Sequence, residues 1–214
     1  MRLFIVKKGS TAVKVRERIV QAADQLFYER GFANIGVNDI LKESGVHKAS
    51  FYKYFREKGD LGLEYIRLRR ERNALVFKDL TSRFSEFERV VSAWVIALKR
   101  EAKMYRLKGC PFAVFSNQIR SSHLFSNNEQ LNSAENEIGN VIQDWEEIFS
   151  AYLRTNPIQR NSGLSEKQIR SFARKMIIAY EGSVQVYFMT GKEEYLEEFE
   201  SSLLLLGEFY KKTQ

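Results

Sequence analysis

A short stretch around residue 50 carries the side chains best suited to contact a nucleic acid. Phe51 and Phe55 are four residues apart, which places both rings on one face of a helix. No carboxylate occurs from Ala49 to Arg56, and the opposite face offers cations, hydroxyl groups and a small apolar surface: Lys48, Ala49, Ser50, Tyr52, Lys53 and Tyr54. Lysine can donate to guanine, alanine and a tyrosine ring can touch a thymine methyl, and the other groups can reach phosphate oxygens. This composition favours a helix that enters the major groove of DNA.

The elements that must position this stretch are two further helices. A first helix, from about Lys14 to Arg30, is predicted by apolar residues spaced three and four apart, with Gly31 as its end: Val15, Ile19, Ala22, Ala23, Leu26 and Phe27. A second, short helix is indicated by Val37, Ile40 and Leu41, and it must stop at Gly45, whose freedom at positive φ permits a tight turn. Two short helices around a glycine turn predict a helix-turn-helix.

The same residues resemble the N-terminal domain of the tetracycline-repressor (TetR) family. The features that match lie between Arg16 and Leu61: the Ala-Ala and Leu-Phe pairs of the first helix, Gly31-Phe32, Asp39-Ile40, Gly45-Val46, the run from Ser50 to Phe55, and Lys58. The resemblance implies that one group of side chains lies near base edges: Asn38, Lys48, Ala49 and Tyr52. It implies that a second group lies near phosphates: His47, Ser50, Lys53, Tyr54 and Lys58.

Two residues depart from the family pattern. Gly36 stands where the family usually has Ser or Thr as the N-cap of the second helix, so that phosphate contact passes to backbone N–H groups. His47 replaces a small polar residue, and it either bonds phosphate or is a solvated turn histidine.

The remainder of the chain predicts helices over about 58–81, 84–106, 111–122, 128–155, 165–190 and 193–211, and hence an all-α protein. Ser165 to Gln168 has the pattern of a capping box, and Gly191 marks the end of the helix that follows. We expect a DNA-binding domain over 11–58 and an effector-binding and dimerisation domain over 59–214. The resemblance implies a C2 dimer formed by the last two helices, through Phe172, Met176, Val184, Tyr187, Phe199, Leu203 and Leu206.

The resemblance also places a small-molecule effector site in the body of the protein. Its candidate lining is mostly aromatic: Tyr65, Trp94, Tyr105, Cys110, Phe112, Phe115, Trp145, Tyr152 and Tyr180. Aromatic residues at helical spacing equally serve as plain core packing. Cys110 precedes a helix, where a lowered pKa would suit a thiol sensor, but a buried, inert thiol is the alternative.

Charge and composition set the broad class. The net charge is +7, and residues 1–60 hold 12 Lys and Arg against 7 Asp and Glu. A basic head favours a polyanionic partner, although a basic face can also serve solubility. Lys7, Lys8, Lys14, Arg16 and Arg18 would form a basic arm along the DNA, or a leader without that role. With a single cysteine and no apolar run near the length of a membrane span, we expect a soluble, cytoplasmic protein.

Two other classes of function were weighed. An enzyme has little support, because His47 and His123 are the only histidines, no CxxC pair occurs, and Gly59 and Gly62 are isolated. We therefore expect no catalytic residues, no metal and no cofactor. A helical protein-interaction adaptor would explain the body but not the cationic face around Lys48. The exposed face of the third helix favours a DNA-binding protein, and the resemblance implies a repressor that an effector releases from a palindromic DNA operator.

Overall fold

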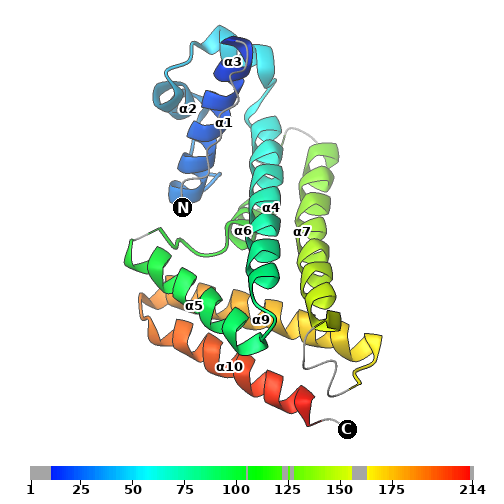
Figure 1. Cartoon of the computed structure of the whole chain (residues 1–214). Coiled ribbons are helices and arrows are strands. Elements are labelled where there is room, and N and C mark those ends of the chain that lie inside the picture. Colours follow the sequence, from blue (N-terminus) through cyan, green and yellow to red (C-terminus); the bar gives the residue numbers. More distant parts are fainter. Residues whose placement is uncertain (1–10, 105, 122–124, 126–127, 156–162, 213–214) are drawn as a thin grey trace. The chain divides into compact units, whose positions relative to one another are not determined.

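A computed structural model describes residues 11–104, 106–121, 125, 128–155 and 163–212. Every regular element in these ranges is an α-helix (Figure 1), which confirms the all-α prediction. The helices are α1 (Thr11–Arg30), α2 (Val37–Ser44), α3 (Lys48–Tyr54), α4 (Lys58–Arg83), α5 (Phe87–Lys103), α6 (Pro111–Ser121), α7 (Asn128–Thr155), α9 (Glu166–Thr190) and α10 (Glu194–Lys211).

Glycines and a capping box end the helices where the sequence predicts. Gly31, with φ of 84°, ends α1 and donates its N–H to the Phe27 carbonyl at 3.0 Å. Gly191, with φ of 70°, does the same for α9. At the start of α9, the Ser165 hydroxyl accepts the Gln168 N–H, and the Gln168 side chain accepts the Ser165 N–H at 2.9 Å. These contacts confirm the capping box.

The chain divides into two compact units, which are described separately. Unit 1 holds the residues up to Leu68 together with Val114–Glu137, and unit 2 holds Arg69–Ala113 together with the residues from Ile138 onward. Helices α4, α6 and α7 therefore each contribute residues to both units. The predicted division into functional domains over 11–58 and 59–214 stays a prediction.

The core of unit 1 is a cluster of aromatic rings. Phe32, in the loop after α1, contacts Phe27 with ring centroids 5.0 Å apart and Phe115 of α6 at 4.9 Å. Tyr65 of α4 contacts Phe27 at 5.5 Å. A glycine on α4 makes room for this packing, because a Cβ at Gly62 would lie 2.7 Å from the Phe32 ring. The beginning of α4 and the end of α6 therefore share a core with α1.

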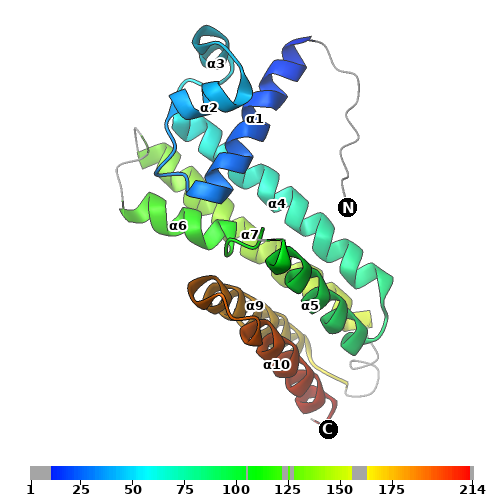
Figure 2. The same ribbon diagram turned by 90° about the vertical axis from the view of Figure 1, so that its left-hand side faces the viewer.

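The core of unit 2 is larger and lies among α4, α5, α7, α9 and α10. Phe77 of α4 stands at its centre, with ring centroids 5.1 Å from Trp94, 5.2 Å from Trp145 and 5.1 Å from Phe149. Tyr180 of α9 also contacts Trp94, at 5.0 Å. Helix α10 packs along both α9 and α5 (Figure 2).

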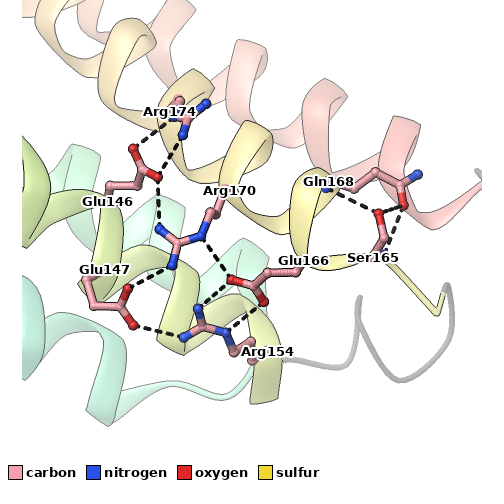
Figure 3. Close-up of polar contacts among 8 residues, drawn as sticks. All are labelled: Glu146, Glu147, Arg154, Ser165, Glu166, Gln168, Arg170 and Arg174. Carbon is pink, nitrogen blue, oxygen red and sulfur yellow. Dashed lines mark hydrogen bonds and ion pairs between the residues drawn. The ribbon is translucent and has the colours of Figure 1, made fainter.

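A network of ion pairs ties the end of α7 to the start of α9 (Figure 3). Arg154 of α7 binds Glu147 on its own helix at 3.0 Å and Glu166 of α9 at 2.7 Å. Arg170 of α9 binds Glu146, which also binds Arg174 at 2.9 Å. Each exposed pair contributes little alone, but shared partners hold the side chains in place and strengthen the set. The network fixes how α7 and α9 meet.

Candidate nucleic-acid interface

The turn between α2 and α3 is held by a glycine and by an arginine from α1. Gly45 has φ of 61°, in the left-handed region, and its N–H caps α2 through the Leu41 carbonyl. Arg18 donates its Nε–H to the Ser44 carbonyl at 3.0 Å and a terminal N–H to the Gly45 carbonyl at 2.8 Å. Val46 is buried beneath the turn. These contacts fix the angle at which α3 leaves α2.

Helix α3 has one buried face and one exposed, polar face. Phe51 and Phe55 are 0% and 4% exposed, and their ring centroids lie 5.8 Å apart, as the spacing predicts. The predicted nucleic-acid contacts are all on the surface or half-buried. Asn38 on α2, His47 before α3, and Lys48, Ala49, Tyr52 and Lys53 on α3 are exposed, whereas Ser50 and Tyr54 are half-buried. The fold therefore leaves these side chains at least partly accessible, and their contacts with DNA stay predictions.

Lys58, at the start of α4, is oriented by the head itself. Its ammonium donates to the Phe32 carbonyl at 3.0 Å and lies 4.5 Å from the centroid of the Phe32 ring. Burial lowers the pKa of Lys58. One of its three N–H groups is thus engaged with the loop after α1. The phosphate contact assigned to Lys58 stays a prediction.

Gly36 caps the start of α2 through its backbone, because it has no side chain. Its N–H donates to the Asp39 carboxylate at 2.8 Å, and its carbonyl accepts the Asp39 N–H at 3.2 Å. This is the half of a capping box that needs no N-cap side chain. A family-type hydroxyl contact to phosphate is not possible at Gly36, because glycine has no donor beyond its backbone.

Two of the five residues predicted to form a basic arm, Arg16 and Arg18, are engaged by the fold. Arg18 binds the α2–α3 turn, and Arg16 pairs with Glu64 at 2.8 Å while lying 5.5 Å from the Phe55 ring centroid. These two arginines position the head, so their assignment to a free arm is corrected. Lys14 is exposed, and Lys7 and Lys8 lie outside the described residues.

The structure divides the predicted effector lining between the two units. Tyr65 and Phe115 belong to the aromatic core of unit 1. Tyr105 lies outside the described residues. The remaining residues are buried in unit 2: Trp94, Cys110, Phe112, Trp145, Tyr152 and Tyr180. Sequence reasoning missed Phe77 and Phe149 of the same core and assigned Phe199 to the dimer interface instead. Phe149 lies one helical turn after Trp145 and could have been found from that spacing.

Cys110 does not have the properties of an activated thiol. It is 1% exposed, and burial, reinforced by the charge of nearby Glu181, raises its pKa. Backbone N–H groups of Phe112 and Ala113 act in the opposite direction but do not prevail. Of the two alternatives that the sequence left open, the buried, inert thiol fits this environment, and a thiol with a lowered pKa does not.

The residues assigned to dimerisation need correction. Five of them are 0% exposed within the single chain: Phe172, Met176, Val184, Phe199 and Leu203. They form the core of unit 2 and have no surface left for a second chain. Tyr187 and Leu206 are half-buried and stay predictions. A helical stripe shows that one face is buried, but it does not reveal which partner buries it.

Large apolar side chains nevertheless remain exposed on the outer faces of the last two helices. Ile178 and Met189 of α9 are 69% and 80% exposed, and Leu205 and Phe209 of α10 are 71% and 60% exposed. A Cβ at Gly182 of α9 would meet nothing within 4 Å, so the backbone between Ile178 and Met189 is open to close approach. The sequence analysis missed these residues because it selected, on each helix, the longest stripe of apolar residues at helical spacing, and these residues lie outside that stripe.

Among the described residues, no group of His, Cys, Asp and Glu side chains is placed to hold a metal ion. Within the same part of the chain, no helix is both long and apolar enough to cross a membrane.

A helix-turn-helix head with a polar, cationic α3, joined to a helical body, defines a class of bacterial transcription regulators, and comparisons with known proteins agree. Residues 19–65 match the model of bacterial regulatory proteins of the tetR family. The HTH-type transcriptional repressor NemR of Escherichia coli K12 is 42% identical over 48 residues, which are 22% of this chain and 24% of NemR. Such matches span about a quarter of the length of the curated relatives.

Solved structures extend the likeness to the whole fold. A TetR-family regulator from Cytophaga hutchinsonii superposes with a TM-score of 0.78 at 16% identity, over 95% of this chain and 98% of that one. FadR from Bacillus subtilis, in complex with stearoyl-CoA, gives 0.61 at 19% identity, over 93% and 99% of the two chains. Residues 19–65 of this chain thus match the tetR family of bacterial regulatory proteins, and the chain shares its overall fold with solved regulators of that family.

Proposed function

We propose that the protein is a DNA-binding transcriptional regulator that represses its targets as a homodimer on a palindromic operator. The observation that carries the proposal is the exposed face of α3. Its cationic and hydroxyl-bearing side chains project from a helix anchored by two buried phenylalanines and by the Arg18-braced turn. Packing α3 against the other helices does not require such a polar, cationic face, whereas recognition of the major groove of DNA does.

In this complex α3 lies in the major groove. Lys48, Ala49 and Tyr52 contact base edges together with Asn38 of α2. Phosphates are contacted by His47, Ser50, Lys53, Tyr54 and Lys58. Lys48 donates to guanine acceptors, and Ala49 with the Tyr52 ring packs on a thymine methyl.

Dimerisation uses the exposed apolar residues of α9 and α10. One head buries too little DNA surface for tight, specific binding, whereas two heads about 34–36 Å apart read successive major grooves. Replacing Leu205 and Phe209 together by Glu places charges at the centre of this surface. We expect the variant to sediment as a monomer in analytical ultracentrifugation. The matched control is Ile96→Glu on α5, an equally exposed apolar residue at 67% that should leave the dimer intact.

Release from DNA follows from an effector that binds the body. NemR is named a repressor, and FadR was solved with stearoyl-CoA bound, which supports both repression and effector control by analogy. An effector that binds a DNA-incompetent conformation more tightly, by about 1–3 kcal/mol, shifts the population away from the operator. Helix α4 contributes residues to both units, so a change in its position in the body also moves residues of the DNA-binding unit. The regulator needs no enzymatic activity, metal or cofactor, and it works in the cytoplasm.

The test is binding of the full-length protein to DNA flanking its own gene, measured across a salt series. The critical variant is Lys48→Ala/Tyr52→Ala, and Lys78→Ala on α4, an exposed lysine, is the charge control. Two lost base contacts at about 1–3 kcal/mol each should weaken specific binding at least about 30-fold. The control should bind as the wild type does.

The outcome also separates a regulator from an adaptor. Saturable binding to a palindrome that falls steeply with salt and is lost in the double variant supports the regulator. Binding that is weak and equal for any sequence, with or without the substitutions, would overturn the proposal. In that case a protein partner of the helical body, unaffected by Lys48 and Tyr52, would be the function to pursue.

A further inference from the structure

The loop between α1 and α2 contains a peptide group that is held from α6. The backbone N–H of Ala33 is partly buried and donates to Oε1 of Gln118 at 3.0 Å. Gln118 lies on α6, 85 residues away along the chain, and both residues belong to unit 1. A partly buried N–H needs an acceptor, because leaving it unpaired costs free energy. Gln118 thus fixes this peptide group from a helix that is distant in sequence.

The Gln118 amide reaches the loop because residue 31 is a glycine. A Cβ at Gly31 would collide with Nε2 of Gln118, and it would lie 3.2 Å from Cδ and 3.3 Å from Oε1 of the same amide. The amide therefore occupies the place that a side chain at residue 31 would need. It contacts the loop at residues 31 and 33, on both sides of Phe32.

Phe32, between these two residues, holds Lys58. The Lys58 ammonium donates to the Phe32 carbonyl at 3.0 Å and lies 4.5 Å from the centroid of the Phe32 ring. The carbonyl of Phe32 and the N–H of Ala33 belong to one peptide group, which is planar, so the direction of one sets the direction of the other. Gln118 binds this plane on one side and Lys58 binds it on the other. The hydrogen bond from Ala33 to Gln118 therefore sets where the Lys58 ammonium is held.

The main chain at the start of α4 is fixed by other contacts. The Asp60 carboxylate accepts the Arg56 N–H at 2.9 Å through Oδ2, and through Oδ1 it accepts the Gln130 side-chain N–H at 3.0 Å. These bonds anchor the backbone on both sides of Lys58 without involving the loop after α1. The peptide group held by Gln118 thus governs the direction of the Lys58 side chain rather than the position of α4.

We propose that Gln118 is a positioning residue for DNA binding, which holds the peptide group between Phe32 and Ala33 so that Lys58 presents its ammonium to a DNA phosphate. The inference rests on the proposed function, in which Lys58 contacts phosphate. An ammonium has three donors, so the one bound to Phe32 sets its position while the others bind the phosphate. Orienting a long side chain before it binds reduces the conformational entropy that binding costs.

A double-mutant cycle tests whether Gln118 acts through Lys58. The four full-length proteins are the wild type, Gln118→Met, Lys58→Met and the variant with both changes. Methionine keeps most of the length of either side chain and removes its polar group. Each protein is titrated, across a salt series, with a duplex from the DNA flanking its own gene and with a duplex of scrambled sequence. Gln143→Met, at an exposed glutamine of α7, is the matched control and should bind as the wild type does.

Gln118→Met should weaken binding about 10-fold, because each of two heads loses a lysine that is oriented in advance. The loss should be the same for both duplexes, since a phosphate contact does not read sequence. Lys58→Met should flatten the slope of log K against log salt concentration by about 2, for one phosphate in each head. In the Lys58→Met protein, the further change Gln118→Met should alter the affinity by less than about 2-fold.

Three results would overturn the inference. The first is an equal loss from Gln118→Met with and without Lys58, which is what a merely less stable fold would give. The second is an unchanged affinity of Gln118→Met, and the third is a Lys58→Met protein that keeps the salt dependence of the wild type. The proposed regulator fails in a different way. Wild-type protein that binds both duplexes equally would count against sequence-specific regulation alone, because the cycle can be completed on either duplex.

Discussion

Replacing Gly62 by Ala tests whether the aromatic core of unit 1 depends on the bare backbone of α4. A Cβ at this position would lie 2.7 Å from Cε2 and 3.0 Å from Cζ of Phe32. The Phe32 ring is 1% exposed, and the rings of Phe27 and Phe115 contact it. It therefore has little freedom to move away.

The magnitude follows from two opposing effects. In an open helix interior, Gly→Ala stabilises by about 0.5–1 kcal/mol, because alanine loses less backbone entropy on folding. Inserting a methyl group into a filled core costs about 1–3 kcal/mol. The second effect is larger, so we expect Gly62→Ala to lower the free energy of unfolding by about 1 kcal/mol.

Gly139 on α7 supplies the matched control, because a Cβ there would meet nothing within 4 Å. Gly139→Ala should raise the free energy of unfolding by about 0.5–1 kcal/mol. Urea unfolding followed by circular dichroism measures both variants against the wild type, with the midpoint and slope reported separately. Equal stabilisation by the two substitutions would refute the reasoning, because it would mean that Phe32 yields without cost.

Three further predictions concern side chains with defined partners. Arg18→Ala should lower the free energy of unfolding of the head by about 1–2 kcal/mol, since the Ser44 and Gly45 carbonyls lose their donor; an unchanged melting temperature would contradict this, and Arg18→Lys should recover part of the loss. A hydrogen bond from Arg174 and, to a smaller extent, one from Arg170 lower the pKa of Glu146 in the folded protein. The stabilisation that the ionised Glu146 contributes is therefore present above its ordinary pKa of 4.5, and it is lost as the pH falls below that value through the folded pKa. Glu146→Gln should therefore flatten the acid side of the stability curve, and an unaltered pH dependence would disprove the assignment. The Cys110 thiol should react with Ellman's reagent only after denaturation, because burial shields it and raises its pKa; native protein that reacts as fast as the unfolded chain would show the thiol to be accessible.

Local order was readable from the sequence because it depends on neighbours along the chain. The spacing of apolar residues predicted the helices to within a few residues, and Gly31, Gly45 and Gly191 marked ends that need a left-handed backbone. The Phe51 and Phe55 pair predicted which face of α3 is buried. The roles assigned to its exposed face depend on DNA and stay predictions.

The tertiary structure decided which partner each side chain has. The sequence marked Phe172, Met176 and Leu203 as an apolar stripe, but only the fold shows that α5 and the paired α9 and α10 bury that stripe within one chain and leave Ile178 and Leu205 outside.

The same holds for charge and for the single thiol. Arg16 and Arg18 have the composition of a DNA-binding arm, yet residues 26 to 48 positions away engage them in the fold. Cys110 lies at a helix start that would favour a thiolate, yet burial beside Glu181 raises its pKa. Helical spacing sets the face on which a residue lies, whereas burial, ion pairing and pKa depend on contacts between distant segments that only the folded chain brings together.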